Sequence, residues 1–361
     1  ELLLVVYSEN HHYKEAWQAI NFIANNSSKE DTDPYLTFNS AIIHYWMGNM
    51  EQALQFSEAM ISNYAPYLKK EDLDATFRQY THVLLEINKI KEAEGVLQRL
   101  LHENEEIPYN QFLLSKYHQK LGQYQKSIQI AEKLLGLEKL DHMVRLLLIE
   151  NYYQLENLSL CFPLIEESFK LYNDHLYFRT WRGLQLFKLG EPQRAERLLE
   201  EVQEEFNDFY LVLLMLAELY QNTNRPRMAE IYFDYAYQYA SWSDDVAGKR
   251  AYFLAKQFPE KFEINELIET SQSKNIPKLN FYIASIYLNI HKDYEKALFF
   301  LEKSSRDLPE YLPSKVLLAN YYEGINMFKQ AKEIYLEVLQ LSPNHPIATK
   351  KLEIYNSNVP S

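Results

Sequence analysis

Few side chains in this sequence have the type and spacing that chemistry requires. Cys161 is the only cysteine, and a lone thiol could serve as a nucleophile where its surroundings lower its pKa. His11, His12 and Glu15 could approach one metal ion from a single helix face, although their spacing implies no further ligand. The sequence contains no G-x-x-x-x-G-K-[ST] phosphate loop, no H-E-x-x-H zinc motif and no G-x-S-x-G nucleophile turn. It therefore predicts a protein that is not an enzyme, with no catalytic residue, cofactor or metal site.

A repeat of 34 residues is the strongest pattern in the chain. Stepping back from Ala331 in steps of 34 reaches Ala297, Glu263, Ala229, Ala195, Cys161, Ser127 and Ala93. Stepping back from Ala319 reaches Ser285, Ala251, Ala217, Gly183, Ile149, Ser115 and Thr81. Seven of the eight residues in each series are small or short, and small side chains let two helices cross closely. Cys161 belongs to the Ala331 series, so we predict a buried packing thiol rather than a nucleophile.

A turn separates the two series in each period. Residues that tolerate a left-handed backbone share one offset there, and they are Asn88, Gly122, Gly190, Asn224 and Asn326. Such residues commonly end a helix, so each period reads as a helix, a short turn and a second helix.

This pattern resembles the tetratricopeptide repeat family, whose 34-residue helical hairpins carry a small residue in each helix and a proline near the end. The best-formed period is Tyr311 to Asn344, and Pro309 and Pro343 match the closing proline. The resemblance covers nearly the whole chain, although the family's first-helix Trp is not kept as a series and Trp181 is shifted by two positions. It implies an all-α fold, a right-handed α-solenoid (superhelix) of antiparallel helix-turn-helix repeats.

The repeats divide the chain into three parts within a single solenoid over residues 1–361. We predict two longer, looser repeats over 1–73, eight 34-residue repeats over 74–345, and a capping helix and tail over 346–361. The extra residues of the first part should lie in loops at 25–33 and 64–72. Pro163 falls inside a second helix, which should start late or kink. The repeat at 244–277 is degenerate, because Phe258-Pro259 replaces its turn, and it is a candidate flexible seam.

Composition narrows the classes of partner. The net charge of −13 and the pI near 5.3 argue against general nucleic-acid binding, which needs clustered Lys and Arg, so no nucleic acid is expected. The acidic surface suits the solubility of a long helical protein. The apolar run at residues 2–6 is too short to span a bilayer, which takes about 20 residues. Membrane association through residues before Glu1 stays open, as does the compartment; the cytoplasm is slightly favoured over a periplasmic or membrane-tethered location.

The resemblance implies a binding groove lined by the first helices of successive repeats. The residues that map to its exposed face are mainly aromatic, with a few polar anchors. They are Tyr35, Phe38, Asn39, Tyr45, Arg78, Tyr109, Phe112, Lys116, Tyr153, Tyr177, Trp181, Tyr252, Tyr282 and Asn320. Aromatic rings dominate binding hot spots, although any single one of them could simply pack between repeats. A clamp for a terminal carboxylate is disfavoured, because Asn39, Arg78 and Lys116 are scattered over three repeats.

Three functions are compatible with these features. The preferred one is a non-enzymatic scaffold that binds a protein or peptide segment in the groove as part of a multi-protein assembly. The second is a regulatory protein that senses a peptide or other small ligand. The third is an envelope component that handles an exported polysaccharide or protein, since aromatic rings stack on sugars as readily as they bind peptides.

Overall fold

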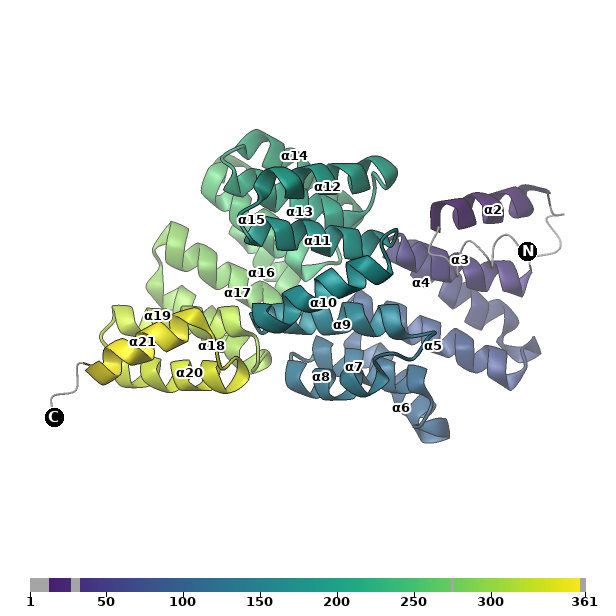
Figure 1. Ribbon diagram of the computed structural model, residues 1–361, viewed down its shortest axis with the longest axis horizontal. Helices are drawn as coiled ribbons and strands as arrows, with labels where there is room; N and C mark the ends of the chain where they lie inside the picture. The colour runs from purple at the N-terminus through teal and green to yellow at the C-terminus, as the bar shows by residue number, and fades with distance from the viewer. Residues whose placement is uncertain (1–12, 27–32, 274–275, 358–361) are drawn as a thin grey trace. The chain divides into compact units, whose positions relative to one another are not determined.

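The computed structural model of the protein describes residues 13–26, 33–273 and 276–357, which form twenty α-helices in consecutive packed pairs (Figure 1). The first helices of the pairs are α3 (Pro34–Trp46), α5 (Lys70–Glu86), α7 (Pro108–Lys120), α9 (Asp141–Gln154), α11 (Leu176–Lys188), α13 (Tyr210–Asn222), α15 (Asp244–Gln257), α17 (Pro277–Ile286) and α19 (Leu312–Gly324). The second helices are α2 (Tyr13–Asn26), α4 (Met50–Ala59), α6 (Ile90–Asn104), α8 (Tyr124–Ala131), α10 (Leu158–Leu171), α12 (Pro192–Glu205), α14 (Pro226–Tyr239), α16 (Ile264–Ser273), α18 (Tyr294–Asp307) and α20 (Phe328–Leu341), and α21 (Pro346–Ser357) ends the series. The predicted all-α fold of paired antiparallel helices is confirmed.

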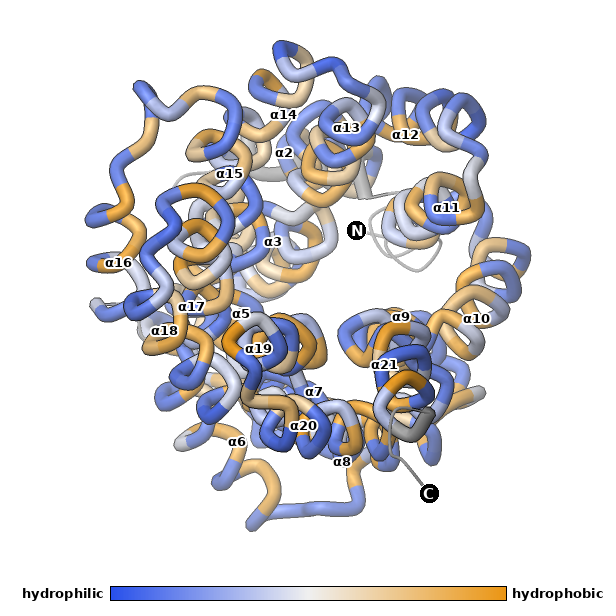
Figure 2. Tube along the Cα trace, turned by 90° about the vertical axis from the view of Figure 1, so that its left-hand side faces the viewer, coloured by the Kyte–Doolittle hydropathy of each residue, from blue (hydrophilic) through white to orange (hydrophobic). Residues whose placement is uncertain are grey.

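Both small-residue series lie in the interior. Every member of the Ala331 series except Glu263 has a relative exposure of 0%, and all members of the Ala319 series are buried. Figure 2 shows the corresponding pattern along individual helices, where hydrophobic positions recur between hydrophilic ones. Large side chains from the partner helix close over the small ones, as Leu199 of α12 does over Gly183 of α11.

The turns within the pairs adopt the predicted left-handed backbone. Asn88, Gly122, Gly190, Asn224 and Asn326 have φ between 59° and 83°. Glu156 (φ 47°) and Lys292 (φ 57°) occupy the same offset and adopt the same conformation, although their side chains do not signal it. Phe258 is the exception, with φ −139°, because Pro259 begins a short 3-10 helix (Pro259–Lys261) in place of the turn.

Two local expectations differ from the structure. α10 begins at Leu158, 34 residues before the start of α12, so Pro163 does not delay it. The delayed second helix is α16, which begins at Ile264, 38 residues after the start of α14. The extra residues expected in a loop at 64–72 instead extend α4, as a π-helix (Met60–Tyr64) and a 3-10 helix (Ala65–Tyr67), before α5 begins. The other expected loop, at 25–33, lies largely outside the described residues.

The chain divides into two compact units. Unit 1 comprises residues 1–117 and 166–242, and unit 2 comprises residues 118–165 and 243–361. Each unit therefore joins segments that are distant in the sequence. In unit 2, Tyr124 and Leu155 share a core cluster with Leu308 and Tyr311. The predicted repeat boundaries stay predictions, because they define repeats rather than compact units.

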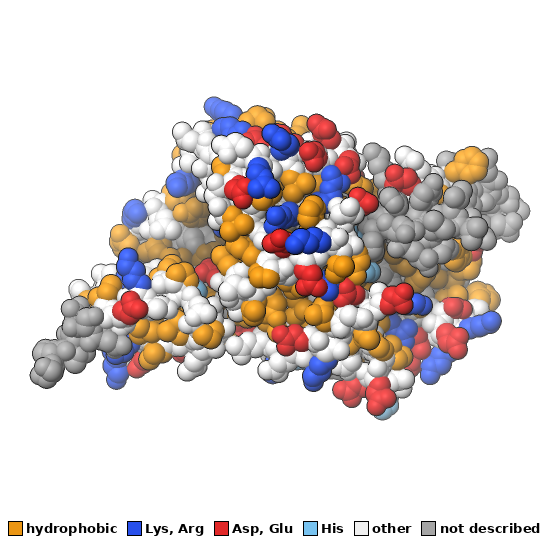
Figure 3. Space-filling view, viewed as in Figure 1, with side chains coloured by type: hydrophobic (Ala, Val, Ile, Leu, Met, Phe, Trp, Pro, Cys, Tyr) orange, Lys and Arg blue, Asp and Glu red, His pale blue; other side chains and the backbone are white. Residues whose placement is uncertain are grey.

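The surface carries both signs of charge. Figure 3 shows acidic and basic side chains intermingled on the face that it presents, with hydrophobic atoms between them. Among the described helices, none has the length and apolar character needed to cross a bilayer.

Substitutions at two glycines can test how closely the helices pack. A Cβ on Gly248 in α15 would lie 2.0 Å from Cδ2 of Tyr282, whose hydroxyl is held by Asp245 at 2.8 Å. Because the ring cannot move away easily, Gly248→Ala should lower the free energy of unfolding by roughly 2 kcal/mol, measured by urea denaturation.

Gly95 in α6 is the matched control. A Cβ added there would meet nothing within 4 Å, and the position lies in the interior of a helix. Gly95→Ala should therefore raise the free energy of unfolding by roughly 0.5–1 kcal/mol through helix propensity. Equal effects at the two positions would contradict the packing described for Gly248.

Candidate functional site

The first helix of the second repeat, α3, carries the N-terminal part of the candidate site in unit 1. It begins because Asp33 accepts a hydrogen bond from Tyr35 N at 2.8 Å and Pro34 occupies the first helical position. Tyr35, Phe38 and Tyr45 follow at spacings of three and seven residues, which places them on one side of the helix. Tyr35 is 38% exposed, Phe38 is half-buried, and Tyr45 is buried.

A polar network connects α3 to α5 and α7. The Tyr45 hydroxyl lies 2.7 Å from His82 Nε2 and donates a hydrogen bond to Glu86 Oε1 at 2.9 Å. Lys116 Nζ approaches the same carboxylate oxygen at 2.5 Å. His82 Nδ1 lies 3.2 Å from the Tyr109 hydroxyl. Five buried or half-buried polar side chains from three first helices thus contact one another.

The hydrogen bond from Tyr45 to Glu86 determines the role of His82 Nε2. Because Tyr45 donates its only hydroxyl proton to Glu86, His82 Nε2 must donate to the Tyr45 oxygen. His82 Nδ1 is then the ring nitrogen that bonds the Tyr109 hydroxyl. Burial, reinforced by the Glu86 carboxylate, raises the pKa of Tyr45 well above its usual value, so this phenol remains a hydrogen-bond donor.

Aromatic contacts extend from this network through the rest of unit 1. His82 packs edge-to-face on Phe112 with ring centroids 5.2 Å apart, and Tyr45 packs on Trp46 at 5.1 Å. Trp46 in turn contacts Tyr177 of α11 at 5.9 Å, so residues about 130 positions apart in the sequence lie against each other. Tyr177 continues the series to Phe209 at 4.8 Å.

The remaining predicted residues of unit 1 are partly or fully enclosed. The Arg78 guanidinium donates to Asn110 Oδ1 at 2.9 Å, and the Asn39 amide donates to the Tyr35 carbonyl oxygen at 2.8 Å. Trp181 is buried in α11. The structure therefore places Tyr45, Phe112, Lys116 and Tyr177 in the interior with Tyr109 half-buried beside them, and it leaves Tyr35, Phe38, Asn39 and Arg78 in contact with solvent.

The predicted residues of unit 2 lie in different surroundings. Tyr282 is buried and donates to Asp245, which also pairs with Lys278 Nζ at 2.6 Å. Asn320 is exposed and accepts a hydrogen bond from Tyr335 at 2.6 Å. Tyr153 on α9 and Tyr252 on α15 are half-buried. The structure thus assigns the predicted residues of unit 2 to separate local contacts.

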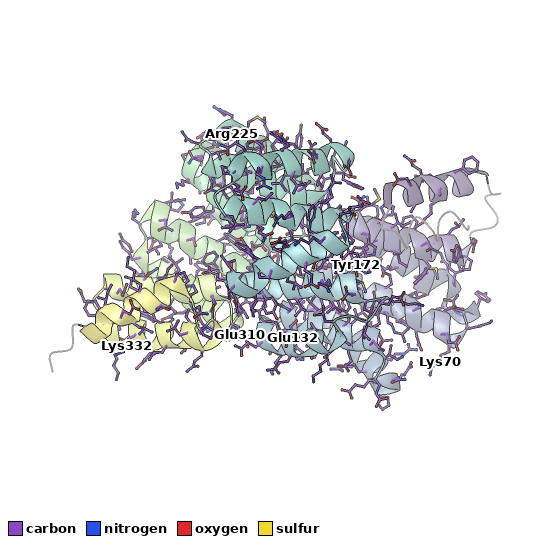
Figure 4. The ribbon with its side chains drawn as sticks, in the orientation of Figure 1. Lys70, Glu132, Tyr172, Arg225, Glu310 and Lys332 are labelled. Atoms are coloured by element: carbon purple, nitrogen blue, oxygen red, sulfur yellow. The ribbon has the colours of Figure 1, made fainter. Side chains whose placement is uncertain are left out.

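The Glu310 carboxylate, from the segment 243–361, bonds the start of α8 in the segment 118–165 and so connects the two segments of unit 2. Glu310, labelled in Figure 4, accepts a hydrogen bond from Gln125 N at 2.8 Å. It thereby satisfies a backbone donor at a helix N-terminus that has no side-chain cap of its own, where negative charge is favourable.

Glu86, Trp46 and His175 belong to the network but not to the predicted set. Glu86 could have been found from its spacing, because it follows His82 by one helical turn on the same side of α5. Trp46 is the residue after Tyr45, and His175 lies in a loop before α11. Its contact with Trp46, at 5.6 Å between ring centroids, depends on tertiary packing and has no sequence signal.

Cys161, which the sequence offers as a possible nucleophile, lies in the packed interior. Cys161 is buried, its thiol donates to the Ile149 carbonyl oxygen at 3.6 Å, and burial raises its pKa to about 12. His11 and His12 lie outside the described residues. Within the described ranges, no group of three or more His, Cys, Asp or Glu side chains is arranged to hold a metal ion.

Comparison with known proteins identifies the repeat type. A family model described as "Tetratricopeptide repeat" matches residues 312–345, which contain α19 and α20. Two curated relatives are both described as "Uncharacterized protein ycf37". The one from Guillardia theta is 31% identical over 107 residues, 28% of this chain and 60% of the relative. The one from Cyanophora paradoxa is 23% identical over 154 residues, 40% of this chain and 88% of the relative. The chain thus spans less than two thirds of the Guillardia theta protein.

Two solved structures share the fold. The APC/C hetero-tetramer Cut9-Hcn1 superposes with a TM-score of 0.52 and 14% identity, covering 95% of this chain and 59% of that one. The human IFIT1 dimer with m7Gppp-AAAA superposes with a TM-score of 0.53 and 15% identity, covering 94% and 89%. These likenesses confirm the predicted helical-repeat fold, and the family model confirms a tetratricopeptide repeat at residues 312–345.

The polar network in unit 1 predicts that Glu86 is important for stability. Replacing it by Gln leaves the Lys116 ammonium, whose side chain is 5% exposed, without a carboxylate. Because a buried charge that loses its partner is costly, Glu86→Gln should lower the free energy of unfolding by about 3 kcal/mol. Glu103→Gln is the control, since Glu103 pairs with Arg99 and Lys70 at the surface and should change stability by less than about 1 kcal/mol. Similar small losses for both variants would contradict the network.

The surroundings of Cys161 predict an inert thiol. With a pKa near 12 and no exposed surface, Cys161 should not react with a thiol reagent at pH 8 while the protein is folded. The same protein in concentrated urea should react fully. Rapid stoichiometric labelling of the native protein would show that the packing role is wrong.

Proposed function

We propose that this tetratricopeptide-repeat protein is a non-enzymatic scaffold that holds a segment of a protein partner against the first helices of its repeats. Proteins built from this repeat generally mediate protein–protein interactions, and no catalytic family is indicated for the chain. The observation that carries the proposal is the solvent-accessible part of the candidate site, formed by Tyr35, Phe38 and Asn39 on α3 and Arg78 on α5.

The buried part of the site fixes α3, the helix that carries most of the exposed part. Tyr45 lies on the same side of α3 as Tyr35 and is held by His82 and Glu86. A side chain whose neighbours are fixed loses little entropy on binding, so a rigid aromatic surface binds more tightly than a mobile one. Tyr35 would supply apolar contact area, while Asn39 and Arg78 would bond the backbone or a polar side chain of the partner.

A protein partner fits the charge of the chain better than a nucleic acid does. The net charge of −13 opposes binding to phosphate backbones. The solved IFIT1 structure contains m7Gppp-AAAA, whereas the Cut9-Hcn1 structure is a protein assembly. With its acidic balance, this chain is better suited to an assembly of the second kind.

The proposal is tested by substitutions on α3. Peptides that bind the wild-type protein are first selected from an unbiased array, and their Kd values are then measured in solution. The double variant Tyr35→Ala/Asn39→Ala should weaken binding by about tenfold or more, as expected for removal of a hot-spot contact. Both substitutions lie at the surface, so circular dichroism and the urea midpoint should remain near the wild-type values.

Tyr67→Ala is the matched control, because Tyr67 is an aromatic residue of the same unit that is 85% exposed and lies in a 3-10 helix between repeats. It should leave the Kd unchanged. Phe112→Ala is unsuitable as a binding test, since Phe112 is 1% exposed and its loss would create a cavity. If every selected peptide binds the double variant as tightly as the wild type, the assignment of the site to α3 is wrong.

A further inference from the structure

Helix α14 exposes an apolar stripe that the first-helix site does not use. Met228, Ile231, Tyr235 and Tyr239 follow at spacings of three, four and four residues, so they lie on one side of the helix. Their relative exposures are 40%, 45%, 49% and 39%. Four large apolar side chains in solvent on a single helix are more than a second helix needs for its own packing.

The core-facing side of α14 is separate from this stripe. Ala229, Phe233 and Ala236 are at most 1% exposed and pack inside the repeat. The helix is therefore apolar on two sides, whereas a surface helix normally needs one. With roughly 40% of each side chain exposed, the stripe presents on the order of 300 Å² of apolar surface, in the range that marks interaction sites.

An acidic column on the neighbouring helix α12 runs beside the stripe. Glu196, Glu200 and Glu204 follow at steps of four residues, one helical turn apart. Arg225, which precedes α14 and is labelled in Figure 4, binds Glu196 through two hydrogen bonds of 2.6 and 2.9 Å. This pair places the start of the column against the start of α14.

A tyrosine pair joins the middle of the column to α14. The Tyr220 hydroxyl donates to Glu200 at 2.9 Å, and the ring of Tyr220 lies 5.2 Å from that of Tyr232 on α14. Glu204 follows one turn farther and is exposed, as is its neighbour Glu201. The apolar stripe thus has an acidic border on the side of α12.

We infer that the stripe of α14 and the acidic column of α12 form a docking surface for an amphipathic α-helix of a protein partner whose apolar side is bordered by Lys or Arg. Apolar anchors three or four residues apart would pack on Met228, Ile231 and Tyr235, as in other helix-in-groove contacts. Basic residues along one edge of that helix would face Glu200 and Glu204. This surface lies on second helices, so it goes beyond the proposed first-helix function and does not depend on it.

Charge favours this occupant over two others. An anionic lipid surface would be repelled by the acidic column. A second copy of this chain would bring another surface that bears the same acidic column and a net charge of −13, so the two copies would repel each other. A basic amphipathic helix complements both the shape of the stripe and its charge.

The inference is tested with three synthetic helical peptides of equal composition of apolar residues. One has a Leu stripe bordered by Lys, one has the same stripe bordered by Glu, and one has the Lys peptide's residues in scrambled order. The Lys-bordered peptide should bind the whole protein, with an affinity that falls as salt is added, and the other two should bind at least tenfold more weakly. Equal binding of all three peptides would overturn the inference.

Substitutions in α14 and α12 locate the binding. Ile231→Ala/Tyr235→Ala should weaken binding of the Lys-bordered peptide about tenfold, and Glu204→Gln should reduce both its affinity and its salt dependence. Tyr237→Ala is the matched control, because Tyr237 is 38% exposed on the same helix but lies off the stripe, and it should have no effect. Tyr35→Ala/Asn39→Ala should also have no effect, which separates this surface from the first-helix site.

Unchanged binding by the α14 double variant would overturn the inference. Dimerisation, or sedimentation with phosphatidylserine vesicles, that Ile231→Ala/Tyr235→Ala abolishes would overturn it in favour of a second copy or a lipid surface.

Discussion

The close crossing of paired helices at small side chains is the constraint on which the rest of the structure depends. In the α13–α14 pair, for example, Ala217 in the first helix and Ala229 in the second are completely buried. At that distance a larger side chain would separate the backbones, and the large residues around the crossing would lose their contacts. The one departure in the Ala331 series, Glu263, is exposed and coincides with the pair in which α16 begins late. Loss of the small residue and displacement of the helix therefore occur together.

The interior of unit 1 contains polar groups whose hydrogen bonds fix the positions of particular side chains, in addition to apolar residues. Glu86 accepts hydrogen bonds or ion contacts from Tyr45 and Lys116, so neither the carboxylate nor the ammonium is buried alone. Such a network stabilises the fold only when every member has its hydrogen-bond or ion partner, because an uncompensated charge in the interior lowers the free energy of unfolding. It also orients Tyr45, whose helix carries Tyr35 into solvent. The rigid interior and the exposed surface are thus parts of one arrangement.

The two proposed surfaces use different helices of the same repeats. Tyr35, Asn39 and Arg78 belong to first helices, whereas Ile231 and Tyr235 belong to a second helix beside an acidic column. A scaffold gains from such a separation, since two partners can be held without competing for one site. The acidic balance of the chain is consistent with both, because neither surface relies on a cluster of basic residues.

The sequence by itself determined the repeat, because packing between helices of a pair is local and each period must supply its own small residue and its own turn. The 34-residue spacing predicted the buried state of Cys161 and the left-handed turns at Asn88 and Gly122. The residue types at Glu156 and Lys292 do not predict the left-handed turn that both adopt, because the helices on either side impose that backbone conformation. Only the tertiary structure decided which predicted aromatic residues are exposed. Tyr177 is buried against Trp46, which is distant in the sequence, and only the tertiary structure brings α3 and α11 together in unit 1. A periodic sequence specifies the neighbours of each helix, and long-range contacts then determine which of its faces remain available to a partner.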